Sequence, residues 1–202
     1  MSLKDVNEIK QAYISRRRIR KLIVISVAHA LEHPGAQNER LGLSEYTYSL
    51  VISSMVANLL NMKNVCKAVL VDCSHIESYN EILRTKVARV NSYNPKLGLE
   101  IHFNSSVHQA ANGYETLYLS STGEKYAKLM QNRLGEMKEL KKDRGIKKRD
   151  NLMFLKSTTC PALILEPLFM SNPAEGILLK NDKFVNDLAN KIYLGCKDII
   201  ES

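Results

Sequence analysis

Long hydrophobic runs are missing from this sequence. No stretch approaches the roughly 20 consecutive apolar residues that cross a bilayer as a helix, so we expect no membrane span. No Cys-x-x-Cys pair is present, which argues against cysteine-based metal and redox motifs. Tryptophan is absent and phenylalanine occurs only four times; the interleaved aromatics with which nucleic-acid binders stack on bases are missing, so we expect no nucleic-acid partner. There is also no internal repeat, low-complexity segment or clear linker.

The composition that remains is that of one soluble domain. The chain has 202 residues, 45% of them apolar and 25% charged, which is enough for a sizeable core. Its net charge of +8 favours an anionic partner but does not choose between a polymer, a membrane surface and nucleic acid. The four cysteines, Cys66, Cys73, Cys160 and Cys196, lie in or beside apolar runs, which indicates buried reduced thiols and leaves a Cys66–Cys73 bridge open.

The first 20 residues differ from the rest. Residues 1–3 have the form of an expression-tag remnant, and a basic segment precedes the apolar run 22–27 and the tripeptide Ala28-His29-Ala30, which together resemble a secretory signal. The apolar run is short for a signal, and cleavage would remove a strand that the domain needs. We therefore expect a basic N-terminal extension over residues 1–20, a catalytic domain over residues 21–202, and synthesis in the cytoplasm without a signal peptide.

Hydrophobic periodicity predicts a single α/β layered domain, with a mostly parallel or mixed central sheet of about six strands flanked by helices. A turn is expected at residues 143–145, inside the basic run 141–149, which we interpret as a solvated face with some capacity to attract anionic polymer. The expected strands cover residues 22–27, 65–72, 98–103, 113–119, 152–155 and 161–166, and the expected helices lie at 45–60, within 75–93, and at 122–140 and 184–200.

The first strand and the turn after it carry two residues with metal-binding chemistry. His29 lies at the tip of the strand, Pro34-Gly35 forces a turn, and Ser44 can cap a helix that opens with Glu45. The carboxyl ends of strands are where open α/β sheets build their sites, and imidazole and carboxylate are both zinc ligands.

Two later strands end in residues of the same kinds. His102 shares a strand face with Asn104, and Glu166 ends a fully apolar strand, where a carboxylate is costly unless it is paired. Each alone is as well explained by a satisfied core histidine or a salt bridge. Together with His29 and Glu45 they suggest an open zinc site, in which three residues bind the metal, water takes the fourth position and the remaining residue handles a proton.

An alternative interpretation uses His33. The stretch from His29 to His33 fits H-x-x-E-H, a metallopeptidase pattern that needs both histidines on one helix face. Because the motif follows a strand and is interrupted by Pro34-Gly35, a helix has no room there. We expect His33, His75 and His108 to be loop histidines, with His33 near enough to line the cleft.

A family resemblance covers residues 21 to the C-terminus. The chain resembles the zinc-dependent N-acetylmuramoyl-L-alanine amidases of bacterial autolysins and phage endolysins. Their pattern is H-G-G-x-D-P-G-A, a helix-opening glutamate, an L-x-x-R-x-x-x-A-N helix, S-x-H-x-N, G-x-E-x-x-Y, R-G-x-K and L-x-E-x-x-F-x-S-N. The corresponding segments here are H-A-L-E-H-P-G-A (29–36), Glu45, the helix with Leu83, Lys86 and Asn91, E-I-H-F-N-S (100–105), G-Y-E-T-L-Y (113–118), R-G-I-K (144–147) and L-I-L-E-P-L-F-M-S-N (163–172).

The resemblance implies roles for the four site residues. His29, Glu45 and His102 would bind one Zn²⁺, and Glu166 would be the catalytic glutamate. Asn104 and His33 are weaker candidates for substrate binding. The bond cut would be the amide between the lactyl group of N-acetylmuramic acid and L-alanine in peptidoglycan.

Local departures from the family pattern bear on substrate preference. Ala30 and Leu31 replace two glycines and His33 replaces an aspartate, which alters the cleft wall but leaves the four site positions filled. We expect a monomer that acts on the bacterial cell wall, either released or phage-delivered, with lysin and autolysin both open. A non-catalytic wall-binding relative and the H-x-x-E-H peptidase remain the alternative functions.

Overall fold

Four parallel apolar strands form one side of a six-stranded sheet in the computed structural model, which describes residues 21–202. The sheet order is β4 (Lys67–Val71), β1 (Leu22–Val27), β5 (Leu97–Ile101), β8 (Ala162–Glu166), β6 (Tyr114–Tyr118) and β7 (Asp143–Lys148). Strand β6 runs antiparallel to β8, and β7 runs parallel to β6. The predicted α/β domain with a mixed six-stranded sheet is therefore confirmed. The N-terminal extension and its tag remnant lie outside the described residues, whereas the apolar run of the signal-like segment forms β1 in the sheet.

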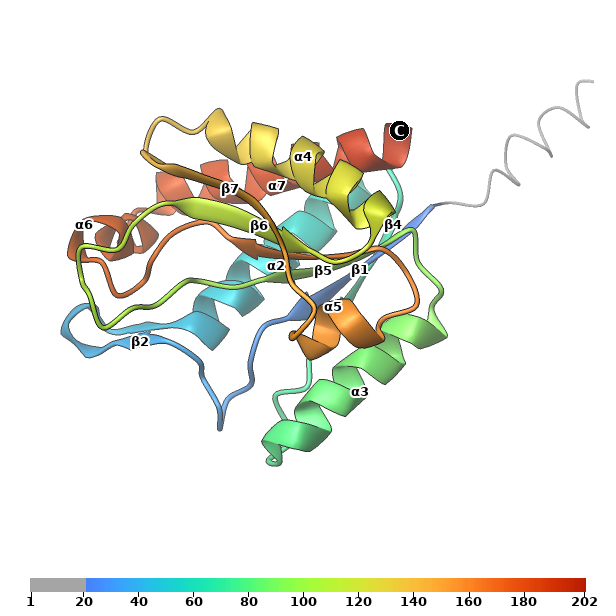
Figure 1. The fold of residues 1–202 in the computed structure, drawn as a ribbon, viewed down its shortest axis with the longest axis horizontal. Helices are drawn as coiled ribbons and strands as arrows, with labels where there is room; N and C mark the ends of the chain where they lie inside the picture. The colour runs from blue at the N-terminus through green and yellow to red at the C-terminus, as the bar shows by residue number, and fades with distance from the viewer. Residues whose placement is uncertain (1–20) are drawn as a thin grey trace, which may run out of the picture.

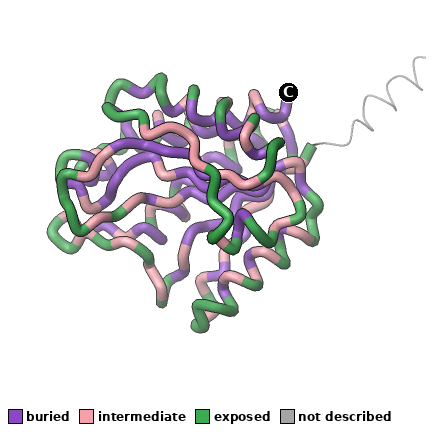
Figure 2. Tube along the Cα trace, viewed as in Figure 1, coloured by how far each residue is buried: buried purple, intermediate pink, exposed green. Residues whose placement is uncertain are grey.

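Helices cover both faces of the sheet (Figure 1). One layer holds α2 (Glu45–Met62), α4 (Ser121–Gly135) and α7 (Asp182–Glu201), and the other holds α3 (Tyr79–Ser92) and α5 (Met153–Ser157). The alternation of β1 explains both contacts, because Ile23 and Ile25 join the core under the first layer and Val24 joins the core under the second. Figure 2 shows the resulting buried central sheet.

Two local expectations are wrong. Residues 152–155, predicted as a strand, begin the short helix α5, because an apolar run of that length does not distinguish a strand from a buried helix. The turn predicted at 143–145 lies within β7, an edge strand whose charged side chains suit its exposed position. Gly145 has φ +75° there, and the pairing of β7 with β6 shifts register.

Smaller elements complete the chain. Strands β2 (Gln37–Asn38) and β3 (Leu43–Ser44) pair around the 3₁₀ helix η1 (Glu39–Leu41), and α6 (Pro173–Gly176) with η2 (Ile177–Lys180) precedes α7. Helix α4 ends at Gly135, five residues before the predicted end.

Local details refine three further expectations. Ser44 is the N-cap of α2, but its side chain makes no capping hydrogen bond. All four cysteines are free, so the Cys66–Cys73 bridge is not formed. Among the described residues, no helix has the length and apolar character needed to span a membrane.

The parallel strands β1, β5 and β8 end at the same edge of the sheet. The chain leaves β1 toward His29, leaves β5 at His102, and ends β8 with Glu166. Residues from three distant parts of the sequence therefore arrive at one edge, where open α/β sheets carry their sites.

Candidate metal centre

His29 stands two residues beyond β1 in a left-handed backbone conformation, with φ +62°. Such a conformation is uncommon for residues other than glycine and costs of order 1–3 kcal/mol, so the surrounding structure must hold it. The next residues form no helix: Ala30 and His33 exchange backbone hydrogen bonds across a tight turn. The helix that an H-x-x-E-H site requires is therefore absent from this stretch.

Glu45 opens α2, and the loop before it is tied to that helix end. The backbone N–H of Glu45 donates to Ala36 O at 2.9 Å, and the backbone N–H of Ala36 donates to Glu45 Oε2 at 2.7 Å. The N–H of Phe103 donates to Glu45 Oε1 at 3.0 Å. Each carboxylate oxygen thus has a backbone donor, which fixes the orientation of a nearly buried side chain.

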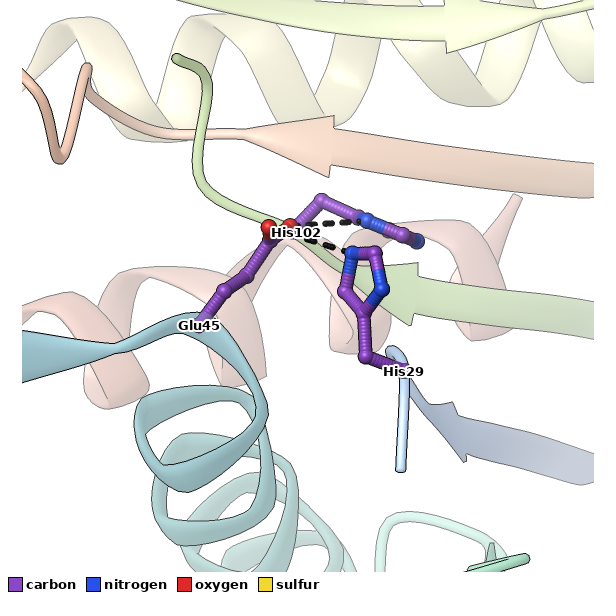
Figure 3. A group of neighbouring side chains, drawn as sticks. All are labelled: His29, Glu45 and His102. Atoms are coloured by element: carbon purple, nitrogen blue, oxygen red, sulfur yellow. Dashed lines mark hydrogen bonds and ion pairs between the residues drawn. The ribbon is translucent and has the colours of Figure 1, made fainter. Parts of the chain in front are cut away.

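The two imidazoles meet this carboxylate from different strands (Figure 3). His29 Nε2 lies 3.1 Å from Glu45 Oε2, and His102 Nδ1 lies 2.9 Å from Glu45 Oε1. The ring centroids of His29 and His102 are 5.0 Å apart, in an edge-to-face arrangement. One ligand atom from each residue falls within 4.8 Å of the others, so the three can hold one metal ion.

Electrostatics favour this arrangement of charges. Burial disfavours the charged form of Glu45, but hydrogen bonds and charges from His102 and His29 outweigh it and lower its pKa. Burial also disfavours the charged form of His102, which lowers its pKa, but the carboxylates of Glu100 and Glu45 outweigh burial and raise that pKa to about 10. A cluster with two carboxylates around His102 therefore attracts positive charge, as a cation site should.

Glu166 ends β8 beside this group. Burial raises the pKa of Glu166 to about 8, and the negative charges of Glu45, Glu115 and Glu100 add to it while His102 opposes it. Its Oε2 is buried and has no hydrogen-bond partner among residues 21–202. A buried carboxyl oxygen without a partner, whose pKa is shifted by the charges of Glu45 and His102, is a candidate for proton transfer.

Gly35 lies against the side chains of His29 and Glu45. It has φ +72°, and a Cβ at this position would lie 2.5 Å from both Glu45 Oε2 and His29 Nε2. Only a residue without a side chain fits so close to two ligand atoms. The donors, their spacing and this cradle together fit a bound metal ion.

An open groove of about 600 Å³ adjoins the group at Gly35. Polar side chains dominate its walls, among them Gln37, Asn38, Ser106 and Gln109. These hydroxyl and amide groups can donate and accept hydrogen bonds, which suits an extended ligand rich in amides and hydroxyls.

The weaker candidates Asn104 and His33 occupy different surroundings. Asn104 Nδ2 donates to Glu115 Oε1 at 3.3 Å, and Glu115 also accepts from Arg144 Nε at 2.6 Å and from Lys147. Two members of the basic run are therefore bound to a buried carboxylate rather than simply solvated. His33 Nε2 lies 2.7 Å from Glu77 O, and His33 is not part of the metal-binding group.

Sequence reasoning gave no role to a buried group behind His102. Glu100 Oε2 lies 3.3 Å from His102 Nε2, and Glu100 Oε1 accepts from Ser26 Oγ at 2.9 Å, with Lys86 Nζ at 3.9 Å. The available signal was strand periodicity, which places Glu100 and His102 on one face of the chain.

Comparisons with known proteins identify the family to which this chain belongs. Residues 23–198 match the family model described as N-acetylmuramoyl-L-alanine amidase. A germination-specific N-acetylmuramoyl-L-alanine amidase of Bacillus subtilis (strain 168) is 31% identical over 117 residues, covering 57% of this chain and 49% of that protein. The endolysin of Bacillus phage SPP1 is 29% identical over 187 residues, covering 89% of this chain and 66% of the endolysin. The match thus spans about half of the first relative and about two thirds of the second.

A solved structure of an amidase catalytic domain has the same fold as this chain. The catalytic domain of an N-acetylmuramoyl-L-alanine amidase from Bacillus (Paenibacillus) polymyxa var. colistinus superimposes with a TM-score of 0.81 at 28% identity, covering 90% of this chain and 98% of that domain. The family match extends over nearly all the described residues. This chain belongs to the N-acetylmuramoyl-L-alanine amidase family.

Proposed function

We propose that residues 21–202 form a zinc-dependent amidase that hydrolyses the bond between the lactyl group of N-acetylmuramic acid and L-alanine in peptidoglycan. One observation carries the proposal: three ligand atoms from His29, Glu45 and His102 lie within 4.8 Å of one another at the strand-end edge of an amidase-family domain.

The donor set suits zinc. Two imidazole nitrogens and a carboxylate oxygen are the ligands of many open zinc sites, and two ligand atoms of a tetrahedral zinc lie about 3.4 Å apart. One ligand atom from each of the three residues lies within 4.8 Å of the others, so small side-chain shifts would give that spacing. When bound, zinc lowers the pKa of a coordinated water to about 7 and polarises the substrate carbonyl.

Glu166 is proposed as the general base and acid. Its buried Oε2 is free to accept a proton from the attacking water, and the carboxyl can then donate that proton to the departing nitrogen of L-alanine. The raised pKa of Glu166, about 8, lies near neutrality, where one group can serve in both directions.

The groove beside Gly35 would hold the substrate. Peptidoglycan offers amides and hydroxyls along its glycan and stem peptide, which match the polar walls of the groove. We propose Asn104 and His33 as residues near which the substrate lies, and we expect a monomer acting on the bacterial cell wall after synthesis in the cytoplasm, as a phage lysin or an autolysin.

The test is the appearance of new N-terminal L-alanine from purified peptidoglycan. Release that stops with chelator and returns with Zn²⁺, and that is missing in His102→Ala, would support the proposal. Release insensitive to chelator would contradict it. Wall binding in a pelleting assay, without any release by the zinc-supplied protein, would favour a non-catalytic wall-binding relative.

A further inference from the structure

We propose that Glu100 is a positioning residue, which accepts a hydrogen bond from the Nε2–H of His102 and so leaves Nδ1 as the nitrogen that binds the metal. The inference rests on the proposed function, because it concerns the same metal site. The family pattern that the chain resembles has serine where Glu100 stands, so this carboxylate is a feature of this sequence.

The two nitrogens of His102 face different carboxylates. Nδ1 lies 2.9 Å from Glu45 Oε1, on the side of the metal-binding group, and Nε2 lies 3.3 Å from Glu100 Oε2. A neutral imidazole carries one N–H, and the hydrogen bond that this N–H makes decides which nitrogen has a free lone pair. An acceptor at Nε2 therefore selects the tautomer in which Nδ1 is available.

Glu100 is itself held from two other elements. Ser26, its register partner on β1, donates through Oγ at 2.9 Å, and Lys86 of α3 places Nζ at 3.9 Å. Ser26 is fully buried and Lys86 is 3% exposed. These contacts fix the position of the Glu100 carboxylate, and the carboxylate in turn fixes the position of the His102 ring.

A purely structural role explains this group less well. Burying a lysine–glutamate pair costs desolvation, and apolar residues of similar volume are often as stable or more so. The pair nevertheless sits directly behind a metal-site histidine, where a carboxylate partner fixes the ring and strengthens its bond to a metal.

The experiment compares wild type, Lys86→Met and the double variant Glu100→Met/Lys86→Met. The double variant removes the acceptor and its counter-charge together, so no unpaired charge stays buried, and methionine roughly preserves the volume. Lys86→Met is the matched control, because it keeps Glu100 beside His102. Two quantities are measured: the Zn²⁺ dissociation constant by competition with a chromophoric chelator, and the ¹⁵N-edited NMR signal of the His102 ring N–H.

We expect the double variant to bind Zn²⁺ about 10- to 100-fold more weakly than Lys86→Met. The slowly exchanging Nε2–H signal should be present in wild type and Lys86→Met, with or without zinc, and lost in the double variant. Equal zinc affinities for the two variants, or a zinc-loaded wild type with the proton on Nδ1, would overturn the inference. If wild type bound no zinc, the proposed function would fail; separately, an equally slow Nε2–H signal in the metal-free double variant would show that Glu100 does not hold that proton and would overturn the inference.

Discussion

A methyl group at Gly35 would press directly on His29 and Glu45, two of the three proposed metal ligands. The Cβ of Gly35→Ala would lie 2.5 Å from Glu45 Oε2 and from His29 Nε2, much closer than non-bonded atoms approach. Because the loop is tied to α2 by the hydrogen bonds of Ala36, it cannot easily retreat. The ligand side chains must therefore move.

Two costs can be separated. A left-handed backbone, φ +72° at Gly35, costs an alanine about 1–2 kcal/mol. Overpacking adds about 1–3 kcal/mol, and if the ligands move to relieve it, that energy appears as a loss of zinc affinity of about 5- to 150-fold. Gly42→Ala is the matched control, because Gly42 has φ +64° but no heavy atom within 4 Å of the added Cβ.

The assay is the Zn²⁺ dissociation constant by chelator competition, together with urea unfolding of the metal-free proteins. We expect Gly42→Ala to lose about 1–2 kcal/mol of unfolding free energy while keeping wild-type zinc affinity. Gly35→Ala should lose zinc affinity as well. Equal zinc affinity in the two variants would refute the reasoning, because it would place the metal away from Gly35.

Three further predictions concern single side chains. Glu166→Gln should keep the zinc content of wild type and lose about 10²- to 10⁴-fold in turnover of purified peptidoglycan; retained turnover would remove Glu166 from proton transfer. His33→Ala should bind zinc as wild type does; failure of this variant to bind zinc would restore the H-x-x-E-H interpretation. Burial raises the pKa of Glu115, but Lys147 and Arg144 outweigh burial and lower that pKa in the folded protein. The ion pairs therefore stabilise the fold above the pKa of Glu115 in the unfolded chain, and this stabilisation is lost as pH falls through its pKa in the folded protein. Glu115→Gln should thus lose less unfolding free energy than wild type on acidification, and an equal loss would contradict that pairing.

Much of the fold could be predicted because its central strands are mostly apolar runs. Strands β1, β5 and β8 are buried on both faces, so their composition alone marks them. Strand β7 gave no such signal: an edge strand needs little apolar surface, and its lysines and arginine read as a solvated loop.

The candidate site also has residues that sequence patterns locate and residues that only the whole fold brings together. His29, Glu45 and His102 follow strand tips or open a helix, which are positions that sequence patterns locate, and the family resemblance assigned their chemistry. Sequence patterns could not locate the partners of Glu100. Ser26 reaches it only when β1 lies beside β5, and Lys86 reaches it only when α3 packs against the sheet. Strand order in space is decided by the whole fold and not by any local stretch.

The most direct test of the metal site is an anomalous-scattering crystal structure of the zinc-supplied protein, measured at the zinc absorption edge. One anomalous peak is predicted, about 2.0–2.2 Å from a nitrogen of His29, a nitrogen of His102 and an oxygen of Glu45. A peak bound by other residues, or no peak from protein supplied with one equivalent of zinc, would contradict the account.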